Sequence, residues 1–242
     1  GDFATPRNLW ECDVIHLIVG LMVIAMLALG LWHRPAAPQA PATTIVVVMT
    51  DDQRADPLWS MPVLQSELVA QGVDFRNFYT PTASCCPSRA SVLTGWYAHM
   101  HGVKGNVGGA TKFLPREMDT ISVALQQAGW RTGLFGKYLN GYDEGSPTTP
   151  GTFPYVAPGW NWWLAFKYPK YRNFEFSVNG VPSGIQPGYS TVRLFDEAVA
   201  FIQAASPTDP LFVFLTPFAP HTSVEIEEQD RYKFTTYSYV SP

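Results

Sequence analysis

The sequence of 242 residues has few charged side chains, few cysteines and no run of basic residues. Only 15% of the residues are Asp, Glu, Lys or Arg, and the formal net charge is -4. Proteins that bind nucleic acid usually carry a basic patch, so this balance gives no support to a nucleic-acid partner. The three cysteines, two of them adjacent, do not indicate a disulfide framework. The 46% of hydrophobic residues is typical of a chain with a packed core and argues against general disorder.

Residues 14–32 form an apolar run without a formally charged side chain. This run is long enough to cross a bilayer as a helix. A signal peptide that is cleaved after the small residues of 35–42, or a buried core helix, would also explain it. We therefore expect an N-terminal flank at 1–13, a transmembrane or signal-anchor segment at 14–32, a stiff Pro/Ala linker at 33–43 and an exported folded domain at 44–242.

Several short runs predict strands in the folded domain. Residues 43–50 and 211–216 are apolar without alternation, which indicates strands buried on both faces of a parallel sheet. Residues 132–135 predict another strand, and Asn179-Gly180 after an alternating run predicts a hairpin turn. A short strand is also expected at 73–79. The pattern indicates an α/β fold with a mostly parallel sheet flanked by helices.

Three helices are predicted between these strands. One covers 62–71 and ends at Gly72, and a second covers 120–128 with Asp119 as its N-cap. A third covers 190–205, where helical spacing places one buried face at Val192, Phe195, Val199 and Ile202.

Two adjacent carboxylates, Asp51 and Asp52, follow the strand predicted at 43–50. Open α/β sheets bind their ligands at the carboxyl ends of strands. Neighbouring carboxylates repel each other, and a hard cation with oxygen ligands, either Ca2+ or Mg2+, relieves the repulsion. A solvated polar loop is the alternative interpretation of this pair.

The sequence places Cys85 and Cys86 directly before Pro87. Proline suits the first turn of a helix because its φ is fixed and it has no amide hydrogen, and Gly95 is a suitable end. Free amide groups at this helix start would stabilise an anion beside the cysteines. Arg89 can hold a neighbouring oxyanion through two hydrogen bonds. Alternatively, the cysteines are small buried hydrophobes and the arginine is solvated.

The Cys-x-Pro-Ser-Arg run that starts at Cys85, followed by Leu-Thr-Gly, resembles the signature of the sulfatase family. The resemblance covers about residues 44–233 and implies an alkaline-phosphatase-like fold that is truncated at its C-terminal side. It implies that Cys85 is oxidised to formylglycine by a formylglycine-generating enzyme or an anaerobic sulfatase-maturating enzyme. It further implies that Asp51, Asp52 and the residue at position 85 bind a calcium ion.

Other motifs extend the resemblance. Lys137, in Gly-Lys-Tyr-Leu-Asn, resembles the family's substrate-contacting lysine, and this version of the run looks like the N-acetylglucosamine-6-sulfatase and heparan 6-O-endosulfatase branch. Many sulfatases have a histidine in this run, and here Asn140 is the candidate for its polar role. His221, in Ala-Pro-His, resembles the histidine that contacts the sulfate or the leaving group. His101 is a candidate for polar lining of the substrate site, although it could equally lie on the surface.

The resemblance implies an enzyme that hydrolyses sulfate esters, with amino-sugar glycans such as glycosaminoglycans as the expected substrates. The protein would be exported to the periplasm or the extracellular face, where it would be either anchored through residues 14–32 or secreted. In the implied mechanism the hydrated formylglycine attacks sulfur, Arg89 and Lys137 neutralise the sulfuryl oxygens, and His221 gives a proton to the leaving alcohol.

Two other functions stay open at this point. A phosphate or phosphonate ester hydrolase of the same superfamily would share the architecture, although most of those enzymes use Thr or Ser with two metals. A catalytically inactive, membrane-tethered sugar-binding module would be consistent with a sequence that lacks the family's downstream Asp-His-Gly or Asp-Asn-Gly element. Because that element completes the metal site, we expect the 242-residue chain to bind calcium weakly.

Overall fold

The computed structural model describes residues 42–54, 61–144 and 149–230. The predicted membrane segment at 14–32 lies outside this part, so that segment and the proposed domain boundaries stay predictions. In the three described ranges, no helix is both long enough and apolar enough to span a bilayer.

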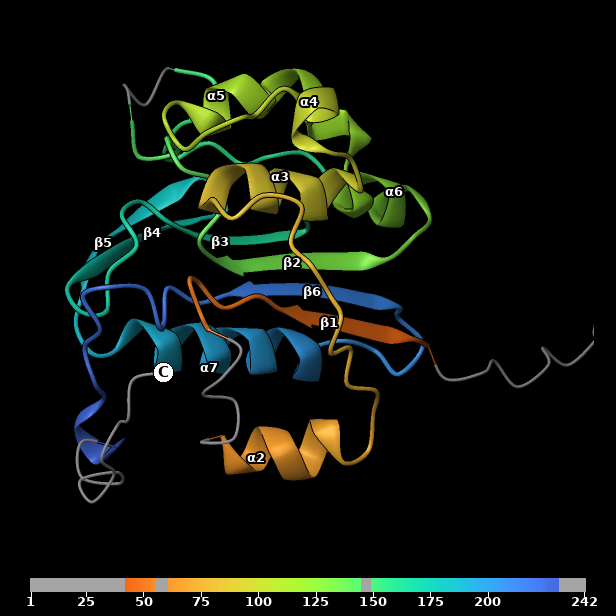
Figure 1. Cartoon of the computed structure of the whole chain (residues 1–242), viewed down its shortest axis with the longest axis vertical. Helices are drawn as coiled ribbons and strands as arrows, with labels where there is room; N and C mark the ends of the chain where they lie inside the picture. The colour runs from red at the N-terminus through yellow and green to blue at the C-terminus, as the bar shows by residue number, and fades with distance from the viewer. Residues whose placement is uncertain (1–41, 55–60, 145–148, 231–242) are drawn as a thin grey trace, which may run out of the picture. The chain divides into compact units, whose positions relative to one another are not determined.

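A mixed six-stranded sheet forms the centre of the described domain (Figure 1). The strand order is β1-β6-β2-β3-β4-β5. The first four strands in this order are mutually parallel, and β4 and β5 are antiparallel additions. The expected parallel sheet is thus confirmed for the half that carries the predicted site residues. The strands are β1 (Thr44–Val48), β2 (Arg131–Gly136), β3 (Trp162–Phe166), β4 (Phe174–Val178), β5 (Val181–Gln186) and β6 (Leu211–Thr216).

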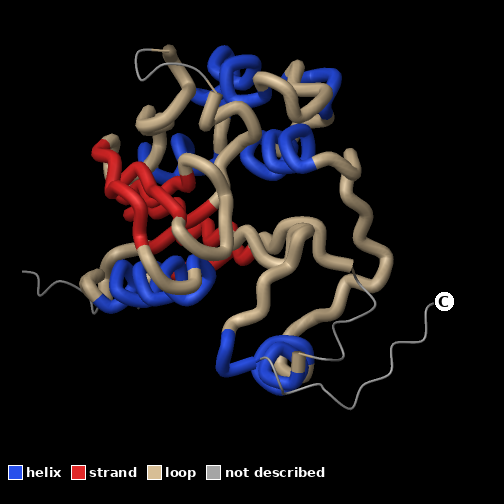
Figure 2. Tube along the Cα trace, turned by 90° about the vertical axis from the view of Figure 1, so that its left-hand side faces the viewer, coloured by secondary structure: helices blue, strands red, loops and turns tan. Residues whose placement is uncertain are grey.

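Helices cover both faces of this sheet. Figure 1 shows α3 to α6 on one face and α7 on the other, and Figure 2 shows the strands between these helices from the side. Near the start of the domain lie the short α2 (Pro62–Leu64) and the π-helical η2 (Gln65–Val69), and near its end the 3-10 helix η4 (Glu228–Asp230). The remaining elements are α3 (Cys85–Thr94), α4 (Ala98–His101), α5 (Gly109–Phe113), the 3-10 helix η3 (Leu114–Asp119), α6 (Ile121–Gln127) and α7 (Ser190–Gln203).

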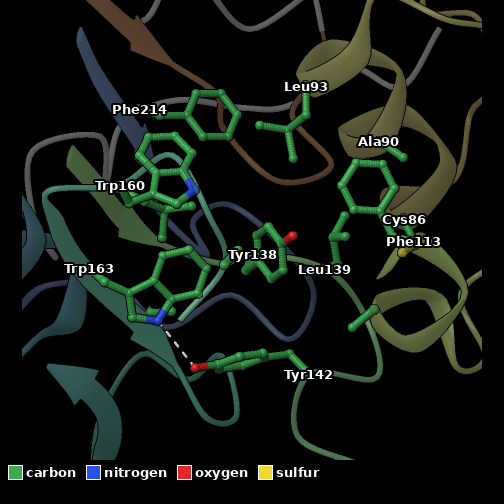
Figure 3. Close-up of a cluster of buried hydrophobic side chains, with 14 of the residues drawn as sticks. Cys86, Ala90, Leu93, Phe113, Tyr138, Leu139, Tyr142, Trp160, Trp163 and Phe214 are labelled. Atoms are coloured by element: carbon green, nitrogen blue, oxygen red, sulfur yellow. Dashed lines mark hydrogen bonds between the residues drawn. The ribbon is translucent and has the colours of Figure 1, made fainter. Parts of the chain in front are cut away.

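Buried aromatic side chains pack both faces of the sheet. On the α3 face, Trp160 stacks on Phe214 of β6 with ring centroids 6.3 Å apart, and Trp163 is fully buried beside them (Figure 3). On the α7 face, Phe135 of β2 meets Phe201 edge to face at 5.5 Å. Burying one such side chain contributes roughly 1.5–3 kcal/mol, so these two layers hold the strand ends in a fixed arrangement.

The buried face of α7 differs from the prediction. Val192, Phe195 and Val199 are 41–48% exposed, whereas Leu194, Ala198 and Phe201 are buried against the sheet. Both sets have helical spacing, because the helix carries two apolar stripes. Periodicity identifies such stripes but does not decide which of them faces the core.

The first strand is also less buried than its composition predicts. Ile45, Val46 and Val48 of β1 are 37%, 46% and 48% exposed. In the described part of the chain β1 pairs with β6 alone, so it is an edge strand rather than a central one. The apolar run without alternation therefore predicted the strand correctly, but its predicted burial on both faces was wrong.

Local predictions around the turns had mixed outcomes. The hairpin is confirmed, since Asn179 and Gly180 join β4 to β5 with φ of 50° and 86°. The strand predicted at 73–79 does not form, and these residues are irregular. The N-cap of α6 is Thr120, not Asp119, because the Thr120 side chain accepts the hydrogen bond from the Val123 amide.

Candidate active site

The predicted site residues converge at one edge of the sheet. Asp51 follows β1, Lys137 follows β2, and His221 lies in the loop after β6. These three strands are adjacent and parallel, so their carboxyl ends meet at the same edge. Cys85 begins α3 and lines a pocket of about 320 Å³ together with Asp51 and Arg89.

A buried ion network joins three of these residues. The carboxylate of Asp51, which is 3% exposed, accepts from Nη2 of Arg89 at 3.2 Å and from Nζ of Lys137 at 2.6 Å. Nη1 of Arg89 also donates to the Lys137 carbonyl at 2.8 Å. The network thus places two cationic side chains, each held by Asp51, next to Cys85, and such donors can bind the oxygens of an anionic substrate group.

Gly136 allows β2 to deliver Lys137 to this network. Its φ is +122°, and a Cβ atom there would lie 2.1 Å from the carbonyl oxygen of Thr216. A side chain at this position would therefore force β2 and β6 apart. The hydroxyl of Thr216 donates to the Lys137 carbonyl at 2.8 Å and fixes the strand end further.

The start of α3 is capped from a distance. Ser84 is the N-cap residue, but its side chain does not cap its own helix. Instead, Oδ1 of Asn106 accepts from the Cys86 amide and from the Ser84 hydroxyl, both at 3.0 Å. Asn106 thus orients the turn that presents Cys85. This role could not be predicted from the sequence, because no local pattern around Asn106 signals it.

The two cysteines have different environments. Cys86 is fully buried, and burial raises the pKa of its thiol to about 11. It packs so closely on Gly109 that a Cβ atom at Gly109 would lie 2.0 Å from its sulfur. Cys85 faces the pocket, and burial together with Asp51 and Asp52 raises the pKa of its thiol, which Lys137 opposes. Unmodified Cys85 is therefore a protonated, weak nucleophile, and because it is only half-buried and lines the pocket, it is the candidate for modification.

Asp52 links Cys85 to His221. Its Oδ1 lies 3.9 Å from the Cys85 sulfur, and its Oδ2 lies 3.4 Å from Nε2 of His221. Nδ1 of the same histidine faces the carbonyl oxygen of Thr222. Both ring nitrogens therefore face oxygen acceptors, so a proton on either nitrogen has an acceptor beside it.

The site has donors that fit a divalent cation. Ligand atoms of Asp51, Cys85 and His221 lie within 4.8 Å of one another. This group includes His221, which the sequence analysis placed with the catalytic residues, and it does not include Asp52. Asp52 nonetheless presents its carboxylate to both Cys85 and His221. Two carboxylates beside one pocket match the oxygen preference of Ca2+ and Mg2+.

Asn140 and His101 were predicted to contact the substrate. Asn140 lines a second pocket of about 210 Å³ with Lys137 and His221, and its buried Oδ1 has no hydrogen-bond partner among the described residues. His101 is 1% exposed; its Nε2 lies 3.1 Å from the Ser91 hydroxyl, and its Nδ1 accepts from the Val103 amide. The geometry thus places Asn140 at a pocket beside Lys137, whereas it gives His101 a structural role in the core.

A buried carboxylate behind the site escaped the sequence analysis. Glu117 of η3 is 5% exposed and accepts hydrogen bonds from the hydroxyls of Tyr155 and Tyr138, at 2.7 and 3.1 Å. Burial raises the pKa of its carboxyl above the ordinary value, and the two hydrogen bonds oppose the shift. No sequence pattern marks this residue as different from a solvated glutamate.

We expect Glu117 to make folding stability depend on pH. Its folded state keeps the proton to a higher pH than the unfolded state, whose pKa is about 4.3. Glu117 therefore makes its full contribution to folding stability below the pKa of the unfolded state, and this contribution is lost as the pH rises through the pKa of the folded state. Glu117→Gln should remove this loss, so the unfolding free energy of the wild type should fall relative to that of the variant as the pH is raised from about 4. Urea unfolding of both proteins across this range measures it, and parallel curves would contradict the prediction.

The fold and this arrangement of residues define the alkaline-phosphatase-like class of α/β proteins. Within it, the chain belongs to the sulfatase family, whose family model, "Sulfatase", matches residues 43–240. A human N-acetylglucosamine-6-sulfatase is 33% identical over 90% of this chain and 40% of its own length. A putative extracellular sulfatase Sulf-1 homolog from Caenorhabditis elegans is 38% identical over 56% of this chain and 19% of its own.

A structural comparison agrees with the fold. A protein solved in complex with its substrate, D-glucosamine-2-N,6-O-disulfate, superposes with a TM-score of 0.68 at 22% sequence identity. The match covers 84% of this chain and 39% of the other. The chain thus spans about 40% of the human relative and of the solved structure, and 19% of the Caenorhabditis elegans relative. The sequence resemblance to the N-acetylglucosamine-6-sulfatase branch is confirmed.

Proposed function

We propose that this protein contributes the nucleophile and the sulfate-binding residues of a sulfatase that acts on amino-sugar sulfates. The observation that carries the proposal is the position of Cys85 at the start of α3, in one pocket with Asp51, Asp52 and Arg89. Lys137 reaches the same place from β2. The names of the relatives and the substrate in the solved complex support an amino sugar as the alcohol part of the ester.

The residues of this chain divide the work as follows. Oxidation of Cys85 to formylglycine would supply a hydrated aldehyde with one hydroxyl to attack sulfur and a second to expel sulfate. Arg89 and Lys137 would neutralise the sulfuryl oxygens, because both lie beside the pocket and both carry full positive charge. His221, held between two acceptors, would give its proton to the leaving alcohol. Asn140, which lines a pocket with Lys137 and His221, would contact the sugar.

A bound calcium ion, held by Asp51, Asp52 and the residue at position 85, would make the hydroxyl of the hydrated aldehyde a stronger nucleophile. We also propose that the protein is exported, that residues 14–32 anchor it, and that a maturating enzyme is its partner. The extracellular sulfatase among the relatives supports export.

Two measurements test the proposed function. Mass spectrometry of the tryptic peptide 77–89, from cells that contain a maturating enzyme, should show formylglycine at position 85; thiol in every molecule would contradict the mechanism. Parallel assays with an aryl sulfate and an aryl phosphate should favour the sulfate. A tenfold preference for phosphate, which corresponds to about 1.4 kcal/mol in barrier, would favour a phosphate ester hydrolase instead.

We expect weak calcium binding by the 242-residue chain. Calcium takes six to eight oxygen ligands, and Asp51, Asp52 and the residue at position 85 supply only part of this shell. Calorimetric titration should therefore show low affinity, and Asp52→Ala should reduce it further. A tight site in the wild type would show that these residues, with others of the chain, complete the shell.

A further inference from the structure

Glu117 is a buried carboxylate without a cation. Its hydrogen-bond donors are the hydroxyls of Tyr138 and Tyr155, and no Lys, Arg or His pairs with it in the described ranges. Burying a carboxylate costs several kcal/mol unless a partner compensates it, and an apolar side chain would fill the same space more cheaply. The energetic cost of burying Glu117 suggests that its two hydrogen bonds hold a tyrosine in a position that matters elsewhere in the protein.

Tyr138 connects this carboxylate to the active site. Its hydroxyl donates to Oε1 of Glu117 at 3.1 Å, and its ring packs edge-on against Trp163 at 5.0 Å and against Tyr142 at 5.9 Å (Figure 3). The preceding residue, Lys137, sends its side chain instead to Asp51. The side chains at these two neighbouring positions are thus held by Glu117 and by Asp51, while the backbone of Lys137 is held by Thr216 and Arg89.

Tyr155 provides an internal comparison. It donates to the other oxygen of the same carboxylate at 2.7 Å, so it shares the buried charge with Tyr138. It belongs to the loop between β2 and β3, and it lines neither of the pockets that contain Cys85 and Lys137. The two tyrosines therefore contribute similarly to the burial of Glu117, but only Tyr138 is next to a site residue.

We propose that Glu117 is a positioning residue for Lys137: through the Tyr138 hydroxyl it fixes the end of β2, so that Nζ of Lys137 stays on Asp51 beside Cys85. Without the Tyr138 hydrogen bond, the segment after Gly136 would keep only the hydrogen bonds at the Lys137 backbone, and a shift of this segment would move the flexible lysine side chain away from Asp51, to which its Nζ donates at 2.6 Å. The catalytic consequence rests on the proposed function, whereas the mechanical coupling between Tyr138 and Lys137 does not.

A double-mutant cycle on the free energy of unfolding tests the coupling. Lys137→Met removes the contact with Asp51, and its destabilising effect is measured in the wild type, in Tyr138→Phe and in Tyr155→Phe. We expect the loss to shrink by at least half in the Tyr138→Phe background, because Lys137 has already left Asp51 there. In the Tyr155→Phe background the loss should equal that in the wild type. Equal losses in all three backgrounds would overturn the proposal, and so would equal coupling to both tyrosines.

Glu117→Gln serves as a second route if Tyr138→Phe does not fold. It keeps the shape and one acceptor oxygen but weakens both hydrogen bonds, and it should also reduce the effect of Lys137→Met. An unchanged effect of Lys137→Met in this background would count against the proposal as well.

Turnover of an aryl sulfate by the matured protein supplies the second readout. Tyr138→Phe should lower kcat about tenfold with KM within about twofold, while Tyr155→Phe should leave kcat unchanged. A wild type without turnover would contradict the proposed function and leave the unfolding cycle to decide on the positioning. An active wild type whose kcat Tyr138→Phe does not change would overturn the positioning role.

Discussion

Replacement of Cys85 by alanine is expected to abolish the hydrolysis of an aryl sulfate by the matured protein. Position 85 faces the pocket next to Asp52 and the Arg89–Asp51–Lys137 network, so it presents the nucleophile where the sulfate would bind. Removal of the nucleophile in an enzyme with covalent catalysis costs on the order of 10⁴- to 10⁶-fold in kcat. Single-turnover and steady-state assays of the two proteins, purified from the same maturating host, measure the loss.

The neighbouring cysteine is the matched control. Cys86→Ala removes a thiol that is fully buried, so it should lower the unfolding free energy by about 1–2 kcal/mol and leave conversion at position 85 intact. Turnover should therefore stay within about threefold of the wild type. Equal inactivation by both substitutions, or activity that survives Cys85→Ala, would disprove the assignment of the nucleophile.

A serine at position 85 separates the formylglycine mechanism from simple nucleophilic attack. The serine hydroxyl can attack sulfur once, but its carbon carries no second hydroxyl to expel the sulfate. The Cys85→Ser protein should therefore accumulate a sulfated form of peptide 77–89 during incubation with substrate. Multiple turnover by this variant would contradict the need for an aldehyde.

Much of the site could be predicted because its residues follow strands that are recognisable locally. The runs at 132–135 and 211–216 are rich in apolar side chains, and in a parallel sheet their carboxyl ends lie at the same edge. Lys137 and His221 follow these runs in the sequence, and a proline with a later glycine marks the helix that presents Cys85. Short-range patterns therefore predicted where these residues lie, while the resemblance to the sulfatase family singled them out as site residues.

The supporting residues could not be predicted, because their partners are distant in the sequence. Asn106 bonds to an amide 20 residues away, and Glu117 bonds to tyrosines 21 and 38 residues away. An isolated asparagine or glutamate looks the same in the sequence whether it is solvated or buried. The same reason explains the wrong face of α7 and the exposed β1, since burial depends on which elements pack together and not on the run itself.

Asp51→Asn is expected to destabilise the fold strongly even in the absence of any metal. Asp51 is the anion between Arg89 and Lys137, whose side chains are 2% and 6% exposed. Asparagine keeps the shape but leaves two buried cations without a counter-charge, and breaking such a buried pair typically costs about 3–5 kcal/mol. Urea unfolding in the presence of a chelator measures this loss separately from any effect of calcium.

Asp52→Asn is the matched control for this prediction. Asp52 is adjacent in the sequence, but its side chain is 56% exposed, and asparagine tolerates its positive φ of 58°. In chelator the control should therefore change the unfolding free energy by no more than about 0.5 kcal/mol. In calcium both variants should lose the stabilisation that the ion gives to the wild type, because both would remove a proposed ligand. Equal stability of the two variants in chelator would show that the Arg89–Asp51–Lys137 network does not hold the fold together.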